Sequence, residues 1–105
     1  MSRWGFGSAV HGTASVGTAS TAVLAANPNR TYAIISNDGT AAVYLALGKA
    51  AVLNEGIRLS PGGTYGDRLE MSRDKSNVFS GAINGISAVA GMKVIAIQGE
   101  SLNPN

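Results

Sequence analysis

The sequence predicts an all-β domain, either a sandwich or a barrel, and three observations support that fold class. About seven short apolar runs follow one another at spacings near ten residues, a pattern typical of short strands joined by turns. Gly, Pro, Asn and Asp, the residues that favour turns, separate these runs. Each run is also too short for an ordinary helix. A chain of 105 residues is long enough for one domain with a modest core.

The first three expected strands lie between residues 20 and 47. Ser20–Ala26 ends at an Asn-Pro-Asn turn, in which the proline fixes φ. Arg30–Ser36 ends at Asn37-Asp38-Gly39, a strong signal for a β-hairpin. Ala41–Leu47 alternates, with its larger aliphatic residues on one face and Tyr44 on the other. This period of two favours a strand, although the residues that follow would suit one short helical turn.

The other four expected strands are short runs bounded by turn residues. They are Ile57–Ser60, Thr64–Ser72, Ser76–Ile83 and Met92–Gln98. In the second of these, Leu69 and Met71 are expected to face inward. The charged residues Arg68 and Glu70 then face outward. Gly85 is expected in the connection that precedes the last strand.

The first 20 residues differ in composition from the rest. They are mostly Gly, Ser, Thr and Ala, and Val10 and Val16 are their only aliphatic side chains larger than alanine after the initial methionine. Such a segment has little to bury, so we expect an extended arm that adds a strand or lies along a neighbouring molecule. A disordered tail is the alternative, and the aromatic residues Trp4 and Phe6 favour docking. The expected division is an N-terminal arm over residues 1–20, a β-sandwich domain over residues 21–101 and a flexible tail over residues 102–105.

The charge pattern argues against nucleic-acid and membrane partners. The 8 Lys and Arg residues against 6 Asp and Glu give a net charge of +2, and the cations are scattered or interleaved with carboxylates. A nucleic-acid-binding face would need clustered cations. No stretch of about 18 apolar residues is present, so no membrane span is expected. The N-terminus lacks the apolar run of a secretory signal, so we expect the protein to be made and used in a cytoplasm.

Residues able to carry catalysis are few. The chain has no Cys, and its one histidine, His11, lies in the arm without a carboxylate nearby in sequence. Asp67, Glu70 and Asp74 stand among cations, which is typical of an exposed salt-bridge ladder. The Gly-rich residues 61–66 lack the Gly-Lys-Ser/Thr of a phosphate loop. We therefore expect no enzymatic activity, no catalytic residue, no cofactor and no metal ion.

Three tyrosines suggest an alternative. Tyr32, Tyr44 and Tyr65 fall on expected strands, where they would offer a stacking platform for a sugar or a base. Tyrosines on strands are more often edge-of-core residues. A carbohydrate-binding sandwich is therefore a further, less favoured interpretation.

One string of residues resembles a pattern in small structural proteins of tailed bacteriophages. In residues 24–37, a leucine, two small residues and Asn-Pro-x-Arg form a turn that leads into a strand ending in Asn37. Further turn and strand motifs follow in the same order. They are Val43–Gly48, Gly56–Leu59, Val78–Ile83 and Lys93–Glu100. The resemblance covers about residues 20–101, without the arm, and implies a small β-sandwich component of the virion.

The resemblance implies a head decoration, or cement, protein, with a tail, neck or fibre-associated module as the alternative. We therefore expect a sandwich of the jelly-roll type that binds the outer surface of the capsid across capsomer joints and stabilises it. The expected partner is the major capsid protein, and symmetric capsid sites favour a homo-oligomer, a trimer over a dimer. The residues expected to contact the capsid are Arg3, Trp4, Phe6 and Val10 of the arm.

Overall fold

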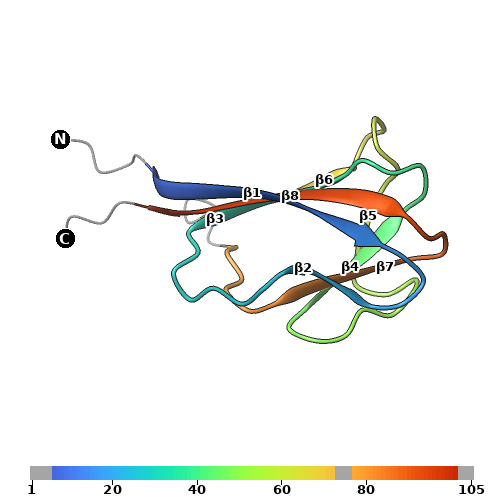
Figure 1. Cartoon of the computed structure of the whole chain (residues 1–105), viewed down its shortest axis with the longest axis horizontal. Helices are drawn as coiled ribbons and strands as arrows, with labels where there is room; N and C mark the ends of the chain where they lie inside the picture. The colour runs from blue at the N-terminus through green and yellow to red at the C-terminus, as the bar shows by residue number, and fades with distance from the viewer. Residues whose placement is uncertain (1–5, 73–76, 102–105) are drawn as a thin grey trace.

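The computed structural model describes residues 6–72 and 77–101, which form a sandwich of two β-sheets (Figure 1). The strands are β1 (Phe6–Val16), β2 (Thr21–Leu24), β3 (Tyr32–Asn37), β4 (Val43–Leu47), β5 (Ile57–Leu59), β6 (Arg68–Ser72), β7 (Ile83–Ser87) and β8 (Met92–Ser101). The all-β prediction is confirmed, in its sandwich form. Within these described ranges, no helix has the length and apolar character needed to cross a bilayer.

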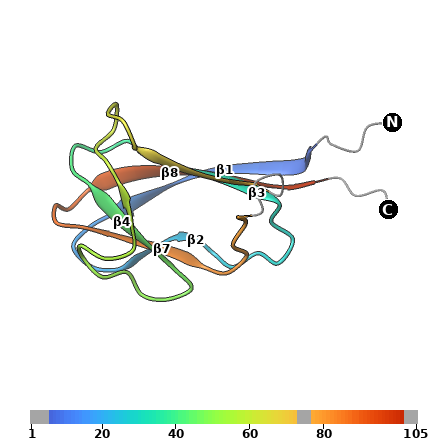
Figure 2. The ribbon, with the colours of Figure 1, turned by 180° about the vertical axis from the view of Figure 1, so that it is seen from behind.

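All pairs of described strands are antiparallel, and each sheet has four strands. The order in the first sheet is β1-β8-β3-β6, and the order in the second sheet is β2-β7-β4-β5. The two layers are visible from both sides of the molecule (Figures 1 and 2). The longest ladder joins β1 to β8 and runs from Phe6 opposite Ser101 to Val16 opposite Met92.

The core lies between the two sheets. In β3, Ala33 and Ile35 are buried and their neighbours along the strand are half-buried, the alternation of a strand with one face on a core. The prediction for β6 is confirmed, because Met71 is buried, Leu69 is half-buried and the charged neighbours are exposed. The most enclosed apolar side chains are those of Val16, Ile35, Val43, Leu45, Leu59, Ile83 and Val94.

Residues 6–16 join the sandwich as β1. They pair with β8 along their length, and Val16 is fully buried in the core. Of the two possibilities for an arm, this part of the chain therefore adds a strand, and adds it to the chain's own first sheet. Backbone hydrogen bonds to β8, an apolar strand, attach β1 to the sheet, and such bonds do not require large side chains on β1. Residues 1–5 and 102–105, which begin the expected arm and form the expected tail, lie outside the described residues.

The hairpin expected at Asn37-Asp38-Gly39 is wrong. β3 pairs with β6 and β8, whereas β4 pairs with β5 and β7, so the turn carries the chain from the first sheet to the second. The buried Asn37 side chain fixes this crossing, since its Oδ1 accepts the Gly39 N–H at 2.8 Å and its Nδ2 donates to Ala41 O at 2.8 Å. The tripeptide does form a tight Asx turn, but the strands that it joins lie in different layers.

The strand expected at Ser76–Ile83 is also wrong. Ser76 lies outside the described residues, and residues 77–82 contain no strand. β7 occupies Ile83–Ser87, with Gly85 at its centre and not in a connection. Gly85 is buried, and a Cβ there would lie 3.2 Å from Val23 Cγ2. The glycine therefore leaves room for a neighbouring side chain and does not end the strand.

The two ends of the sandwich differ. β1 begins and β8 ends at one end, because Phe6 lies opposite Ser101. The connections β1–β2, β3–β4, β5–β6 and β7–β8 gather at the other end, which we call the loop end (Figure 1). Backbone hydrogen bonds join these connections, from Gly62 N to Gly39 O at 2.8 Å and from Ser87 N to Gly17 O at 2.8 Å.

Candidate functional site

The residues expected to contact a capsid are only partly described by the structure. Arg3 and Trp4 lie outside the described residues, and Phe6 is the first residue of β1. Val10 lies on β1 opposite Gln98, and its side chain is 59% exposed. Single apolar side chains on a surface are common, so Val10 alone does not define a site.

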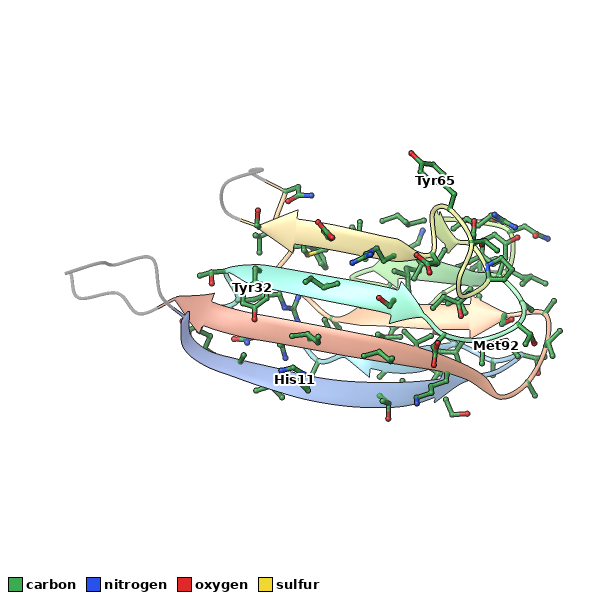
Figure 3. The ribbon with its side chains drawn as sticks, turned by 90° about the horizontal axis from the view of Figure 1, so that it is seen from above. His11, Tyr32, Tyr65 and Met92 are labelled. Carbon is green, nitrogen blue, oxygen red and sulfur yellow. The ribbon has the colours of Figure 1, made fainter. Side chains whose placement is uncertain are left out.

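His11 is not brought next to a carboxylate cluster in the described part of the chain. It is exposed on β1 opposite Ile97, on the outer face of the first sheet (Figure 3). No group of three or more His, Cys, Asp or Glu side chains that could hold a metal ion occurs among the described residues. Glu70 pairs with Arg68, with 3.6 Å between the charged groups, and Asp74 lies outside the described residues. Among those of these groups that the structure describes, no acid–base pair or metal site is assembled.

The three tyrosines lie on three different surfaces. Tyr32 is on β3 at the outer face of the first sheet, and Tyr44 is on β4 at the outer face of the second, between two buried core residues. Tyr65 was expected on a strand, but β6 begins only at Arg68, and Tyr65 stands on the β5–β6 connection (Figure 3). The tyrosines therefore do not form one stacking platform.

The outer face of the first sheet is apolar along its two central strands. Ile34 of β3 lies opposite Ile97 of β8, and Ile95 lies opposite Ser36, one pair further along. The residues before and after each isoleucine are buried in the core or beside it, so the alternation of the strands turns the isoleucines outward. We call Ile34, Ile95 and Ile97 the isoleucine strip.

Strands that are apolar on both faces are typical of sheets that are covered on both faces. An antiparallel sheet with one face in water normally alternates apolar and polar residues. The three isoleucines are half-buried by their neighbours in the sheet. The described residues form only two layers, so none of them makes a third layer over the isoleucine strip (Figures 1 and 2). The strip is therefore a surface suited to a contact with another molecule.

Polar side chains surround the isoleucine strip. On the β6 side are Arg68 and Glu70, which form the salt bridge described above. On the β1 side, His11 and Thr13 are exposed opposite the strip, and Lys93 is exposed beyond its end nearer the loops. An apolar centre with a polar rim is the usual anatomy of a protein–protein interface.

The loop end presents an aromatic side chain on the β5–β6 connection. The Tyr65 side chain is fully exposed. The connection below it is tied internally, since Thr64 N–H donates to Pro61 O at 3.1 Å and Gly63 N–H donates to Asp67 Oδ2 at 3.0 Å. A tyrosine side chain has few rotatable bonds and so loses little conformational entropy when it binds, and tyrosines are enriched among binding hot spots. Tyr65 is therefore a second candidate contact, separate from the isoleucine strip.

A small pocket lies beside β4 and β5. Its volume is about 220 Å³, and its lining includes Leu47, Lys49, Val52 and Glu55. Small-molecule sites usually enclose about 300–1,000 Å³ and bury most of the ligand. The pocket is smaller than that, and Leu47 and Val52 are themselves 38% and 46% exposed. The pocket is therefore a shallow surface depression, and its lining contains no cluster of catalytic groups.

The Asn-Pro-Asn-Arg turn, which carries part of the resemblance, holds the fold together. Arg30 is only 4% exposed. Its guanidinium donates to the backbone oxygens of Ala25, Phe79 and Gly81 and to Oε1 of Gln98. Burial lowers the pKa of this guanidinium from its ordinary value. The arginine thus joins the β2–β3 connection to β8 and to the segment before β7.

The isoleucine strip and Tyr65 were not singled out from the sequence as contact residues. For the strip a signal exists, because Ala33-Ile34-Ile35 and Val94–Ile97 are continuous apolar runs and not alternating ones. Which strands are central, and which face is left open, depends on pairings between residues far apart in the chain. For Tyr65, the glycines on both sides indicate a turn, and this turn signal contradicts the strand expected from Thr64 onward.

Comparisons with known protein families, curated proteins and solved structures find no match to this chain. Its function must therefore be argued from its own residues and their arrangement.

Proposed function

We propose that the protein is a structural component of a tailed-phage virion, namely a head decoration or cement protein. It binds the outer surface of the capsid across capsomer joints and stabilises the head, with the major capsid protein as its partner. The protein is made in the host cytoplasm and located in the virion. The resemblance over about residues 20–101, the strand order of the sandwich and the open isoleucine strip support this proposal.

Within this proposal we infer that the sandwich is of the jelly-roll type. A jelly roll contains eight strands in two packed sheets, wound as two Greek keys. The orders β1-β8-β3-β6 and β2-β7-β4-β5 support this type, because the chain passes between the sheets at every connection except β4–β5. Jelly rolls occur in viral capsid proteins and also in lectins and cupins, so the surface, and not the fold, has to decide the function.

The isoleucine strip is the observation that carries the proposal. A decoration protein works through contact area and needs no reacting groups, and the strip offers apolar area on the broad face of a sheet. Completing the burial of a half-buried isoleucine contributes about 1 kcal/mol, so the strip contributes roughly 3 kcal/mol per copy. Repetition over many symmetric sites, and any linkage between copies, multiplies the effect on the head.

The proposal also includes a contact between the capsid and the N-terminal arm, and the fold decides which variants can test that contact. Deleting residues 2–18 would remove β1 and the buried Val16, and would leave β8 at a new sheet edge. Loss of binding after such a deletion would report unfolding as readily as a lost contact. Substitution of Arg3, Trp4 or Val10 is the better test, since Val10 is exposed and lies outside the core.

The decisive experiment mixes the purified protein with expanded heads of the phage whose genome encodes it and measures bound copies by gel densitometry and cryo-electron microscopy. The test variant is the double substitution Ile34→Ser and Ile97→Ser. The control is Val52→Ser, which removes a more exposed aliphatic side chain beside β4 and β5. The wild type and the control are expected to saturate the heads. The double variant is expected to bind roughly 30-fold more weakly, from about 2 kcal/mol of lost burial.

Each outcome has a distinct meaning. If the wild type does not bind heads and is found on the tail, neck or fibres of the virion, the decoration role is wrong and the alternative virion role gains support. If the wild type binds heads and the double variant binds equally well, the decoration role stands and the isoleucine strip is not the contact. Symmetric capsid sites favour a homo-oligomer there, with a trimer the expected form.

A further inference from the structure

The outer edge of β1 is an unpaired strand edge. β1 forms one side of the first sheet and pairs only with β8, from Phe6 opposite Ser101 to Val16 opposite Met92. On its other side, no strand of the described residues pairs with it. The backbone N–H and C=O groups on such an edge form a template on which another strand can pair.

The other three sheet edges carry features that discourage pairing, and β1 lacks them. β6 has Arg68 and Glu70 exposed along it, β5 is only 3 residues long, and β2 is 4 residues long and has a register shift between Ala22 and Leu24. Short strands, charged side chains and irregularities are the means by which proteins protect edges. β1 has 11 residues, and its only register shift lies at its start, between Phe6 and Ser8.

We propose that β1 pairs antiparallel with β1 of a second copy of this chain, around a twofold axis perpendicular to the sheet. The two first sheets then join into one sheet of eight strands, four from each copy. Such an interface uses the same patch on both copies. The inference does not depend on the virion role, and a trimer on a capsid would use other surfaces.

Charge favours a second copy as the occupant of this edge. Around a twofold axis each residue of β1 meets a residue of the same strand, so a charged strand would oppose like charges. Phe6–Val16 contains no Asp, Glu, Lys or Arg, so no carboxylate, ammonium or guanidinium group is placed opposite its own copy. Its one titratable side chain is that of His11, which meets His11 of the second copy at the axis. In a self-pairing of β6 about its midpoint, Glu70 would lie opposite Glu70 of the second copy.

The expected contact is small, which sets the conditions for detecting it. Pairing over the 11 residues of β1 at about 3.3 Å per residue, with a sheet roughly 10 Å thick, covers about 360 Å² on each copy. The total of roughly 720 Å² is below the 1,200 Å² or so of a stable protein–protein interface. We therefore expect a dimer that forms reversibly and is populated at high micromolar to millimolar concentrations.

Gly12 gives a clean way to test the axis. A Cβ at Gly12 would have no atom within 4 Å, the φ of Gly12 is not in the left-handed region, and the residue is exposed, so the isolated sandwich has room for the start of a side chain there. The midpoint of Phe6–Val16 is His11, one residue away. In a full-length self-pairing, the two Gly12 residues are therefore diagonal neighbours, about 7–8 Å apart and on the same face.

The experiment measures mass by sedimentation equilibrium from about 10 µM to 1 mM for the wild type, Gly12→Lys, Gly12→Glu and an equimolar mixture of the two variants. The controls are Ala50→Lys and Ala50→Glu, at an exposed position on the β4–β5 connection. The wild type and controls are expected to rise from 10.6 kDa toward twice that mass. Each Gly12 variant alone is expected to associate at least 10-fold more weakly, and the mixture is expected to recover association.

Amide hydrogen exchange supplies the second measurement, because it locates the contact without a substitution. Exchange of β1 amides in the wild type is expected to slow as concentration rises, while exchange at the exposed edge of β6 stays constant. A protein that remains monomeric at 1 mM overturns the inference. So does a dimer that both Gly12 variants retain, a mixture that fails to recover, or protection that appears elsewhere than β1.

Discussion

Arg30 offers a sharp test of how this small core is held, because a single buried side chain joins three segments. Its guanidinium donates to Ala25 O at 2.7 Å, to Phe79 O at 2.5 Å, to Gly81 O at 3.1 Å and to Gln98 Oε1 at 2.8 Å. The substitution Arg30→Met keeps most of the side-chain volume and removes all four donors. Three backbone oxygens lose this donor, and Gln98 Oε1 keeps only the longer hydrogen bond from Asn27 Nδ2 at 3.4 Å.

The expected loss of stability can be bounded from these contacts. A hydrogen bond from a charged donor contributes about 1.5–3 kcal/mol, but bonds made by one group are not additive. Ala25 is exposed, so its oxygen can bind water after the substitution. A buried acceptor that loses its donor costs about 1–3 kcal/mol, and two backbone oxygens besides that of Ala25 lose theirs, so we expect Arg30→Met to cost about 3–5 kcal/mol. For a domain of this size, that corresponds to a fall in Tm of roughly 15–25 °C.

Urea unfolding followed by circular dichroism measures the effect. The matched control is Arg58→Met, since the Arg58 side chain is exposed and its guanidinium donates to Ser60 Oγ at 3.0 Å in an exposed hydrogen bond. The control is expected to lose less than about 0.5 kcal/mol. Arg30→Lys keeps the charge without the planar fork and should lie between the two. If the free energy of unfolding of Arg30→Met lies within 1 kcal/mol of the wild-type value, the buried guanidinium does not hold these segments together.

Two further substitutions test single positions by the same urea assay. Asn37→Ala removes the amide that fixes the crossing between the sheets. We expect a loss of about 2–4 kcal/mol, because the backbone oxygens of Ala41, Leu59 and Ser60, which are buried or partly buried, lose their donor. A loss below 1 kcal/mol would mean that the turn holds without this amide. Gly56→Ala places a Cβ at a φ of +87° and 2.2 Å from Leu45 O, so we expect a loss of roughly 3 kcal/mol. Gly12→Ala, which meets no atom within 4 Å, is its control and should be nearly neutral.

The strands marked by local chemistry were predictable from the sequence. Turn residues act within four or five positions, so the runs around β3, β4, β5 and β8 were found with small errors at their ends. The inward and outward residues of β6 followed from alternation alone. These features depend on neighbours along the chain, and a single sequence contains that information.

The features that were missed depend on distant residues. β1 has little apolar character of its own, and its place follows from β8, about 80 residues later in the chain. The sequence predicts a break at Gly85, whereas its role is to make room for Val23, a side chain on another strand. The isoleucine strip required both the strand order and the identity of the covered face. Local patterns specify neither.

The meeting of Phe6 and Ser101 at one end of the sandwich has a practical consequence for anyone who wishes to attach a cargo to this protein. A tag or enzyme joined ahead of β1 and another joined behind β8 would leave from the same side, opposite the loop end (Figure 1). The two fused proteins would therefore not cover the loop end or Tyr65. Such a geometry suits a two-colour label, whose fluorophores would sit close enough for energy transfer and would report separation of the two strands on unfolding.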